Sequence, residues 1–220
     1  VINRHIELTA VRRDGTPLPV EVRVIPLSLD GKTIFSAFLH DITERKQVEA
    51  IREHEATHDP LTGLLNRRGM FDLLSQAIAR VKRTRASLAL LFIDLDGFKQ
   101  INDTHGHEAG DAVLREVAAR LQASIRQTDT AARLGGDEFT VILENIKHGI
   151  SDANMLAQKI LETLQHPIQL DSVTATISAS IGISMHHPYD ERSADQLVNA
   201  ADSAMYTAKH AGKNQVCVHK

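Results

Sequence analysis

Two short acidic stretches carry the residue types in this sequence that could do phosphate chemistry. Asp94 and Asp96 end the apolar run 88–93, and Asp137 and Glu138 follow a pair of adjacent glycines. Neighbouring carboxylates repel each other unless a cation, a proton or a basic ligand compensates their charge. Proteins bind Mg²⁺ through one or two carboxylates together with substrate phosphate oxygens. If the two stretches face each other, they could therefore clamp metal ions for phosphoryl transfer.

Local patterns predict how the chain presents these acids. The apolar run 88–93 is typical of a strand buried on both faces, and its end would bring out the first pair of acids. Residues 130–134 and 139–143 predict two strands joined by the glycine pair, because glycine readily adopts the positive φ of a tight turn. Two simpler interpretations stay open on these residues alone. The hairpin could be a solvated acidic turn, and Asp94 or Asp96 could cap the next helix.

Strands and helices alternate on both sides of the acidic stretches. An apolar period near 3.6 predicts the helices, and β-branched residues predict the strands. The predicted helices cover 67–83 and 111–126, and two more run from Ser151 up to Pro167 and from Ser193 up to Gly212. A short helical piece carries Phe98, Lys99 and Asn102, and a loop with His105 and His107 follows it. Further strands are predicted over 173–185 and 216–218. This order predicts an α+β fold with a central mixed β-sheet flanked by helices.

The first part of the chain predicts a small separate element. Its pattern gives three antiparallel strands, over 5–12, 20–27 and 33–39, with Asp-Gly turns at 14–15 and 30–31. Such a meander is marginal alone and needs cover over one face. The polar segment 42–58 that follows predicts a linker helix. Its few apolar residues leave open whether it is a solvated helix or a coiled-coil seam.

The composition is that of an ordinary globular protein, and it argues against nucleic-acid-binding, disulfide-rich and membrane-spanning proteins. The 220 residues are 42% hydrophobic and carry a net charge of −3, so there is no basic footprint for nucleic acid. Cys217 is the only cysteine, which we interpret as a buried thiol, and it rules out an internal disulfide framework. No apolar run reaches the length of a membrane span. We expect no nucleic-acid partner, no membrane segment in this chain and a cytoplasmic location, although a longer protein could be membrane-attached through upstream segments.

Both acidic stretches resemble the GGDEF family of diguanylate cyclases. The family pattern F-x-D-x-D-x-F-K-x-x-N-D is present from Phe92 to Asp103, and the signature pentapeptide is unaltered from Gly135 to Phe139. Further family segments occur in family order at 59–68, 105–111 and 205–209, so the resemblance covers about residues 58–218. The segment 13–47 resembles the C-terminal half of a PAS sensor domain. We therefore expect a partial PAS β-meander over 1–41, a signalling helix over 42–58, and a GGDEF domain with a nucleotide-cyclase, palm-like fold over 59–220.

The resemblance implies a two-metal active site. The ligands of two Mg²⁺ or Mn²⁺ ions would be the carboxylates of Asp94, Asp137 and Glu138 and the main-chain carbonyl of Leu95. The family match also implies that Asp137 accepts the proton of an attacking 3′-hydroxyl. Lys99 would stabilise the charge on the transferring phosphate.

The same resemblance implies a GTP pocket beside these acids. Asn102 and Asp111 would bind the guanine edge, although on residue patterns alone they are equally well a turn residue and a helix cap. Lys213 stands where an arginine is common in the family, so a bidentate phosphate contact is not available there. The remaining substrate-binding residues implied by the match are Phe98, Lys99, His107, Gly135, Gly136 and Lys209. The other histidines, including His186 and His187, are interpreted as surface residues because no ligand spacing links them.

An R-x-x-D pattern precedes the signature hairpin. Arg126 and Asp129 could simply be a helix C-terminal arginine and a turn residue. At this offset from the signature, the pattern resembles the inhibitory product site of the family, in which the arginine grips guanine and phosphate and the aspartate accepts from a guanine edge.

The resemblance implies a diguanylate cyclase that condenses two GTP molecules into cyclic di-GMP and two pyrophosphates. One site holds one GTP, so two protomers must face each other, and a catalytic homodimer is expected. Cyclic di-GMP would also be a feedback inhibitor. The alternative is a catalytically weak module that binds GTP or cyclic di-GMP and regulates a partner. The intact signature and metal residues favour the enzyme.

Overall fold

The structure is a computed structural model that describes residues 5–29, 32–170 and 174–219. The predicted turn at 30–31 and the predicted strand start at Val173 lie outside the described residues. The chain separates into two compact units, Val1–Glu55 and Ala56–Lys220. In the described part of the chain, no helix has both the length and the apolar character needed to cross a membrane.

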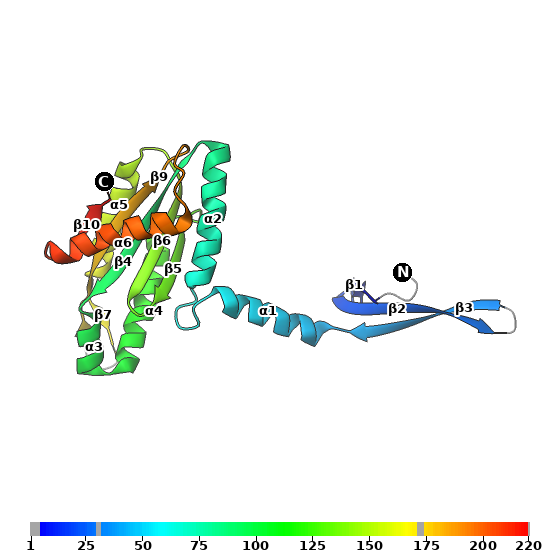
Figure 1. Cartoon of the computed structure of the whole chain (residues 1–220). Helices are drawn as coiled ribbons and strands as arrows, with labels where there is room; N and C mark the ends of the chain where they lie inside the picture. The colour runs from blue at the N-terminus through cyan, green and yellow to red at the C-terminus, as the bar shows by residue number, and fades with distance from the viewer. Residues whose placement is uncertain (1–4, 30–31, 171–173, 220) are drawn as a thin grey trace. The chain divides into compact units, whose positions relative to one another are not determined.

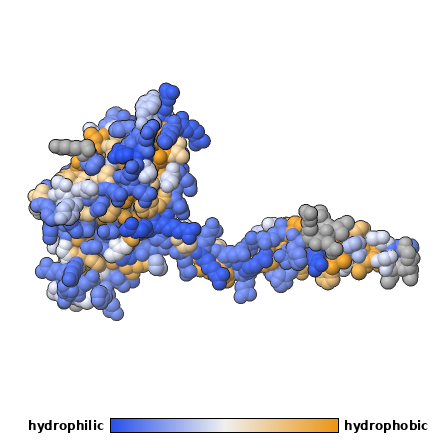
Figure 2. Space-filling view, in the orientation of Figure 1, coloured by the Kyte–Doolittle hydropathy of each residue, from blue (hydrophilic) through white to orange (hydrophobic). Residues whose placement is uncertain are grey.

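The first unit is a three-stranded antiparallel sheet followed by a helix. The sheet has the order β1-β2-β3, with β1 over His5–Val11, β2 over Pro17–Leu29 and β3 over Lys32–Asp41, as the sequence predicts. Helix α1, Thr43–Thr57, follows, and none of its residues is buried (Figure 1). Phe35, Phe38 and Leu39 of β3 are 60–63% exposed, and this apolar surface is visible in Figure 2. The sheet therefore leaves uncovered the kind of surface that a meander needs to bury against other elements.

The second unit is built on a five-stranded sheet with the order β10-β9-β4-β6-β5. The central strand β4, Ser87–Asp96, is antiparallel to β6, Glu138–Ile146, and to β9, Ser178–His186. On the outside, β5, Thr130–Gly135, is antiparallel to β6, whereas β10, Gln215–Val218, is parallel to β9. The predicted mixed sheet is confirmed.

Helices cover both faces of this sheet (Figure 1). The side chains of β4 alternate between two apolar cores, as a period of two requires. Ala89, Leu91, Ile93 and Leu95 pack with α4, His107–Ser124, and α5, Ile150–Leu164. Leu88, Leu90 and Phe92 pack with α2, Arg67–Thr84, and α6, Ala194–His210. Because Asp94 and Asp96 continue the second set, their side chains lie on the α2 and α6 face.

Three predicted elements differ from the structure. The expected loop with His105 and His107 is absent from this described segment, because α3, Phe98–His105, and α4 are separated only by Gly106, whose φ of 85° ends one helix and lets the next begin at once. Helix α4 therefore starts before Asp111. The expected strand 173–185 is interrupted: β8, Thr174–Ala175, pairs with β7, Ile168–Gln169, and only β9 joins the main sheet.

Candidate active site

The two acidic stretches meet at the end of β4. The register places Asp94 directly opposite Glu138 of β6 and Ser180 of β9. Directly opposed residues of antiparallel strands share a face of the sheet, so the two carboxylates lie side by side. Asp94 is buried, with only 6% of its surface exposed. The sequence prediction that these stretches converge is correct in geometry.

Asp94 has one neutralised oxygen and one that lacks a partner. The Nζ atom of Lys209, from α6, lies 2.7 Å from Oδ2. The other oxygen, Oδ1, is buried and has no hydrogen-bond partner among the described residues. Burial raises the pKa of Asp94, the ion pair with Lys209 opposes this, and the charge of Asp137 adds to it. A buried, unpaired carboxylate oxygen is costly, and a cation would satisfy it.

Glu138 carries the same kind of excess negative charge. Burial raises the pKa of Glu138, and the negative charges of Asp94, Asp202 and Asp137 raise it further, while Arg67 opposes the shift from 3.7 Å. These residues therefore fit a divalent cation by charge. In the part of the chain that the structure describes, no group of three or more His, Cys, Asp or Glu side chains could hold a metal ion by itself. Further ligands would have to be main-chain or substrate oxygens.

A groove with a volume of about 660 Å³ opens beside these acids. Its lysines come from two places in the chain: Lys99 from α3, and Lys209 and Lys213 from the C-terminal part. Asp137 lines the same groove, and its main-chain carbonyl accepts a hydrogen bond from Leu95 N at 3.2 Å. Lys213 lies in the turn after the last helix, because α6 ends at His210. The groove thus combines lysine ammonium groups, which could bind a triphosphate, with the carboxylate of Asp137, which could accept a proton from a hydroxyl group.

The predicted guanine-binding residues lie on two tightly packed helices. Asn102 is inside α3 and Asp111 is inside α4, so the alternative interpretations as a turn residue and a helix cap are wrong. A Cβ at Gly110, the neighbour of Asp111, would lie 1.9 Å from Asn102 Oδ1, so a larger residue there would displace the Asn102 side chain. His107 is exposed at the start of α4 and is not among the residues that line the groove.

Comparison with known proteins decides which family this arrangement represents. The family model described as "Diguanylate cyclase, GGDEF domain" matches residues 56–215. The chain belongs to the GGDEF diguanylate cyclase family. A PAS domain model matches residues 2–44. Diguanylate cyclase TpbB of Pseudomonas aeruginosa is 44% identical over 206 residues, which are 91% of this chain and 47% of that protein. Diguanylate cyclase DgcM of Escherichia coli is 34% identical over 92% of this chain and 48% of its own length. The chain thus spans less than half of these curated relatives.

Solved GGDEF structures share the fold. A sensory box/GGDEF family protein from Caulobacter crescentus is 45% identical, with a TM-score of 0.68 over 71% of this chain and 99% of that one. The coiled coil and GGDEF domain of DgcB from the same organism was solved in complex with c-di-GMP. It is 30% identical, with a TM-score of 0.72 over 80% of this chain and 91% of that one.

The GGDEF hairpin is tied to the start of its domain by a residue that the sequence analysis missed. Arg133 donates to both carboxylate oxygens of Asp59, at 3.0 and 3.1 Å, and to the carbonyl of Gly136, at 2.9 and 3.1 Å. Gly135 and Gly136 have φ values of 141° and 54°, as the predicted turn requires. Arg133 thus holds the hairpin tip beside Asp137. The available signal was an aspartate in the family segment 59–68 and an arginine in the predicted strand 130–134, but their contact spans 74 positions.

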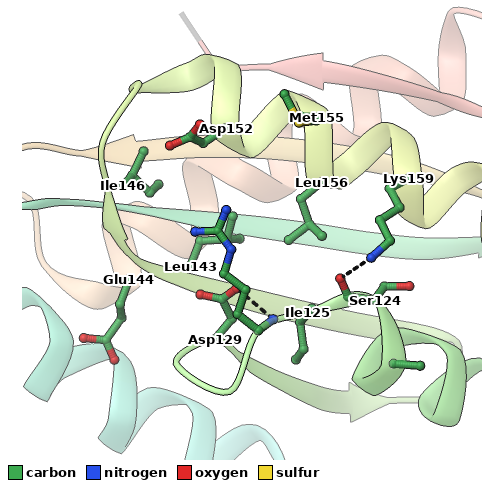
Figure 3. Close-up of a pocket in the computed structure, with 12 residues that line it drawn as sticks. Ser124, Ile125, Asp129, Leu143, Glu144, Ile146, Asp152, Met155, Leu156 and Lys159 are labelled. Atoms are coloured by element: carbon green, nitrogen blue, oxygen red, sulfur yellow. Dashed lines mark hydrogen bonds between the residues drawn. The ribbon is translucent and has the colours of Figure 1, made fainter.

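The GGDEF chain has a second pocket around the R-x-x-D pattern. Figure 3 shows this pocket, of about 300 Å³, between the turn after α4 and the side chains of α5. Arg126 and Asp129 both line it, and Arg126 N donates to Asp129 Oδ2 at 3.2 Å. Asp152 and Lys159 of α5 line the opposite wall and were not predicted. Lys159 Nζ donates to the carbonyl of Ser124 at 2.9 Å.

Two surface and core assignments in the GGDEF chain are wrong. His186 is not a surface residue: it is completely buried in β9, and its Nδ1 lies 3.3 Å from Asp190 Oδ2. His187 is hydrogen-bonded to Ser87 Oγ at 3.2 Å and is exposed. Cys217 is partly exposed in β10, whereas a buried thiol was expected. Both histidines contact residues far away in the sequence, His186 in register with Leu88 and His187 with Ser87, which local patterns do not report.

Finally, neither of the first two acids caps the following helix. The N-cap of α3 is Gly97, and it makes no side-chain capping hydrogen bond. Asp94 pairs with Lys209, and Asp96 accepts hydrogen bonds from Ser178, Ser180 and Asn214. The capping interpretation is therefore wrong for both.

Proposed function

We propose that this chain is a diguanylate cyclase that joins two GTP molecules into cyclic di-GMP and releases two pyrophosphates. The carrying observation is the buried Asp94 beside the half-buried Glu138, at the edge of a lysine-lined groove: Lys209 and Arg67 do not fully balance the negative charge gathered there. This juxtaposition suits a triphosphate bound together with divalent cations. The proposal takes residues 1–41 as a partial PAS domain, 42–58 as a signalling helix and 59–220 as the GGDEF domain.

Two Mg²⁺ or Mn²⁺ ions would be held by Asp94, Asp137 and Glu138 and by the Leu95 carbonyl. When bound, such ions neutralise the phosphates and lower the pKa of the attacking hydroxyl. The unpaired Asp94 Oδ1 is the atom that most clearly lacks a partner for this role.

The protein groups of the groove have separate tasks. Asp137 accepts the proton from the 3′-hydroxyl, whose oxygen attacks the α-phosphate while pyrophosphate leaves. Lys99, Lys209 and Lys213 balance the phosphate charge, and the backbone near Phe98 and at Gly135 and Gly136 approaches it closely. Asn102 and Asp111 bind the guanine edge, supported by the close approach of α3 and α4 at Gly110. His107, exposed at the start of α4, would contact the nucleotide from the rim.

The reaction requires two copies of the chain. Each site holds one GTP, and the product contains two 3′–5′ linkages, so two hairpins must oppose each other in a homodimer. The linker helix is the element that could bring the two sites together.

Cyclic di-GMP inhibits the enzyme through the pocket at Arg126 and Asp129. The guanidinium suits a guanine or a phosphate, and the carboxylate suits a guanine edge. Lys159 adds a second cation to the same pocket. Bound product would act from outside the GTP groove and would be non-competitive with GTP.

The test is product formation from GTP and Mg²⁺, followed by chromatography over a range of protein concentrations. We expect cyclic di-GMP and pyrophosphate, with specific activity that rises with protein concentration as dimers form. GTP binding without any product at the highest concentration would instead identify a regulatory binding module. Equal specific activity at every dilution of a monomeric protein would contradict the dimer.

A further inference from the structure

Asp96 lies two residues from Asp94 but has very different surroundings. Its Oδ1 accepts from Ser180 Oγ at 2.9 Å. Its Oδ2 accepts from Ser178 Oγ at 3.2 Å and from the backbone N of Asn214 at 3.0 Å. Both oxygens of Asp96 are therefore engaged by the protein, whereas Asp94 leaves one oxygen without a partner. The first two donors belong to β9, and the third belongs to the turn after α6.

That turn holds an unusual backbone conformation. Lys213 and Asn214 have φ values of 62° and 46°, so two consecutive non-glycine residues are left-handed. Such residues persist only where their surroundings hold them. Three hydrogen bonds do so here: Lys213 N to the carbonyl of Ala208 at 3.1 Å, Asn214 N to Asp96, and Gln165 Nε2 to Asn214 Oδ1 at 2.7 Å.

The turn delivers a cation to the phosphate groove. Lys213 lines the groove together with Lys209, and both flank the end of α6. Asp96 is the only side chain of β4 that is hydrogen-bonded to this turn among the described residues. It is therefore the link between the metal-binding end of the sheet and the lysine that would contact the triphosphate.

We propose that Asp96 is a positioning residue that fixes Lys213 over the phosphate groove, and that it is not a metal ligand. The inference rests on the proposed function, since it assigns a role within the same GTP site. Asp96 itself lines the groove, but both of its oxygens are engaged by protein donors. In this proposal it acts on GTP through the turn, so removing its carboxylate frees Lys213 without removing a metal ligand.

Two substitutions distinguish positioning from metal binding. Asp96→Ala removes all three hydrogen bonds and should raise the KM for GTP about tenfold, with a smaller change in kcat. Asp96→Asn keeps an oxygen that can accept from Asn214 N, and its NH₂ can donate to a serine hydroxyl, so it should recover most of that loss. A metal ligand would behave differently: both variants would lose turnover, and both would need much more Mg²⁺ for half-maximal activity. That result would overturn the proposal.

A double-mutant cycle tests the route through Lys213. In a Lys213→Ala background, Asp96→Ala should raise KM by less than twofold, because the residue it positions is already absent. A full tenfold increase in that background would overturn the proposal. Ser178→Ala is the matched control, since it removes a donor to the same carboxylate but leaves the bond to Asn214, and it should change KM by less than twofold. Thermal unfolding of every variant checks the fold.

The design separates this inference from the proposed function. If the wild-type chain forms no cyclic di-GMP, the proposed reaction fails. The dissociation constant of GTPαS is then measured in the presence of Mg²⁺ for the wild type, Asp96→Ala, Lys213→Ala and the double variant. Non-additive losses of GTPαS affinity would still support positioning. Additive losses would reject it, whatever the outcome for catalysis.

Discussion

The two ends of the central sheet treat buried charge in opposite ways. At the end of β4 that carries Asp94, burial and neighbouring acids raise the pKa values of Asp94 and Glu138, and one carboxylate oxygen has no partner. At the other end, near Leu88, the charged side chains are paired, Arg192 with Asp190 and Arg80 with Glu144, although the buried ring nitrogens of His186 have no hydrogen-bond partner among the described residues. Hydrogen bonds from Arg192 lower the pKa of Asp190 to about 2.

The paired end has the geometry of a structural network. Arg192 donates to Asp190 Oδ1 at 3.1 Å, to Ser184 Oγ at 3.2 Å and to the Met185 carbonyl. Arg80 donates to both oxygens of Glu144, at 3.0 and 2.7 Å. At the paired end, the ion pairs stabilise the fold. At the Asp94 end, the carboxylates keep negative charge that a bound ligand could neutralise.

The largest expected effect would come from Asp94→Asn. The amide keeps the shape of the side chain but removes the charge, so cyclic di-GMP formation should fall by at least about 100-fold. The fold should remain intact, because the lost charge was already unfavourable when buried. Turnover and thermal unfolding are the measurements, with Asp72→Asn on the exposed surface of α2 as the control. If the variant had near wild-type turnover and unfolded normally, Asp94 would not be a metal ligand.

A second large effect, on inhibition by cyclic di-GMP, is expected at the Arg126 pocket, which is separate from the acidic stretches at Asp94 and Asp137. Arg126→Ala should weaken inhibition by cyclic di-GMP at least about tenfold, because the pocket loses the guanidinium that would bind the product. The inhibition constant is measured relative to each variant's own uninhibited rate, with Arg115→Ala on the exposed part of α4 as the control. Unchanged inhibition would show that feedback arises elsewhere.

At the paired end, Asp190→Asn should cost stability. The folded pKa of about 2 lies below the ordinary value of 3.8, so the ionised carboxylate stabilises the fold by about 2 kcal/mol at neutral pH. This corresponds to a decrease in Tm of about 4–8 °C. The contribution is present above pH 3.8 and is lost as the pH falls through about 2. Equal Tm values for wild type and variant at pH 7 would show that the ionised Asp190 does not stabilise the fold, and the two ends of the sheet would then not differ in this way. Glu191→Gln, at the exposed neighbouring position, is the control.

Much of the fold follows from local sequence patterns. The apolar run before Asp94 and the glycine pair of the hairpin predict a central strand and a tight turn, and the pairing of β4 with β6 then brings Asp94 and Glu138 together. The period of the helices was predictable for the same reason, since each buries a single stripe of apolar residues.

The remaining features depend on contacts between distant residues. His186 looks like a surface histidine in the sequence, but it is completely buried in β9, where it pairs with Leu88 of the central strand β4. The salt bridge between Asp59 and Arg133 joins positions 74 apart. The left-handed turn at Lys213 follows Gly212, but the side chains of Asp96 and Gln165 that hold it lie far away in the sequence. In each case the energy comes from a partner that the local pattern does not contain.

The central claim is that the charge at the Asp94 end belongs to a ligand, and thermal unfolding of Glu138→Gln tests it most directly. A raised folded pKa means that the fold gains stability as the pH falls and that the ionised carboxylate costs stability at neutral pH. In EDTA at pH 7, the variant should therefore melt above wild type, by about 1 °C because the side chain is 38% exposed and partly screened. Glu162→Gln, on the exposed face of α5, is the control.

With Mg²⁺ and GTPαS the order should reverse, since the wild type gains binding free energy from a ligand that the variant cannot hold as tightly. This crossover is the result that our account predicts. If Glu138→Gln melts below the wild type in EDTA, or if both proteins gain the same stability from Mg²⁺ and GTPαS, the negative charge at this end of the sheet is not reserved for a ligand.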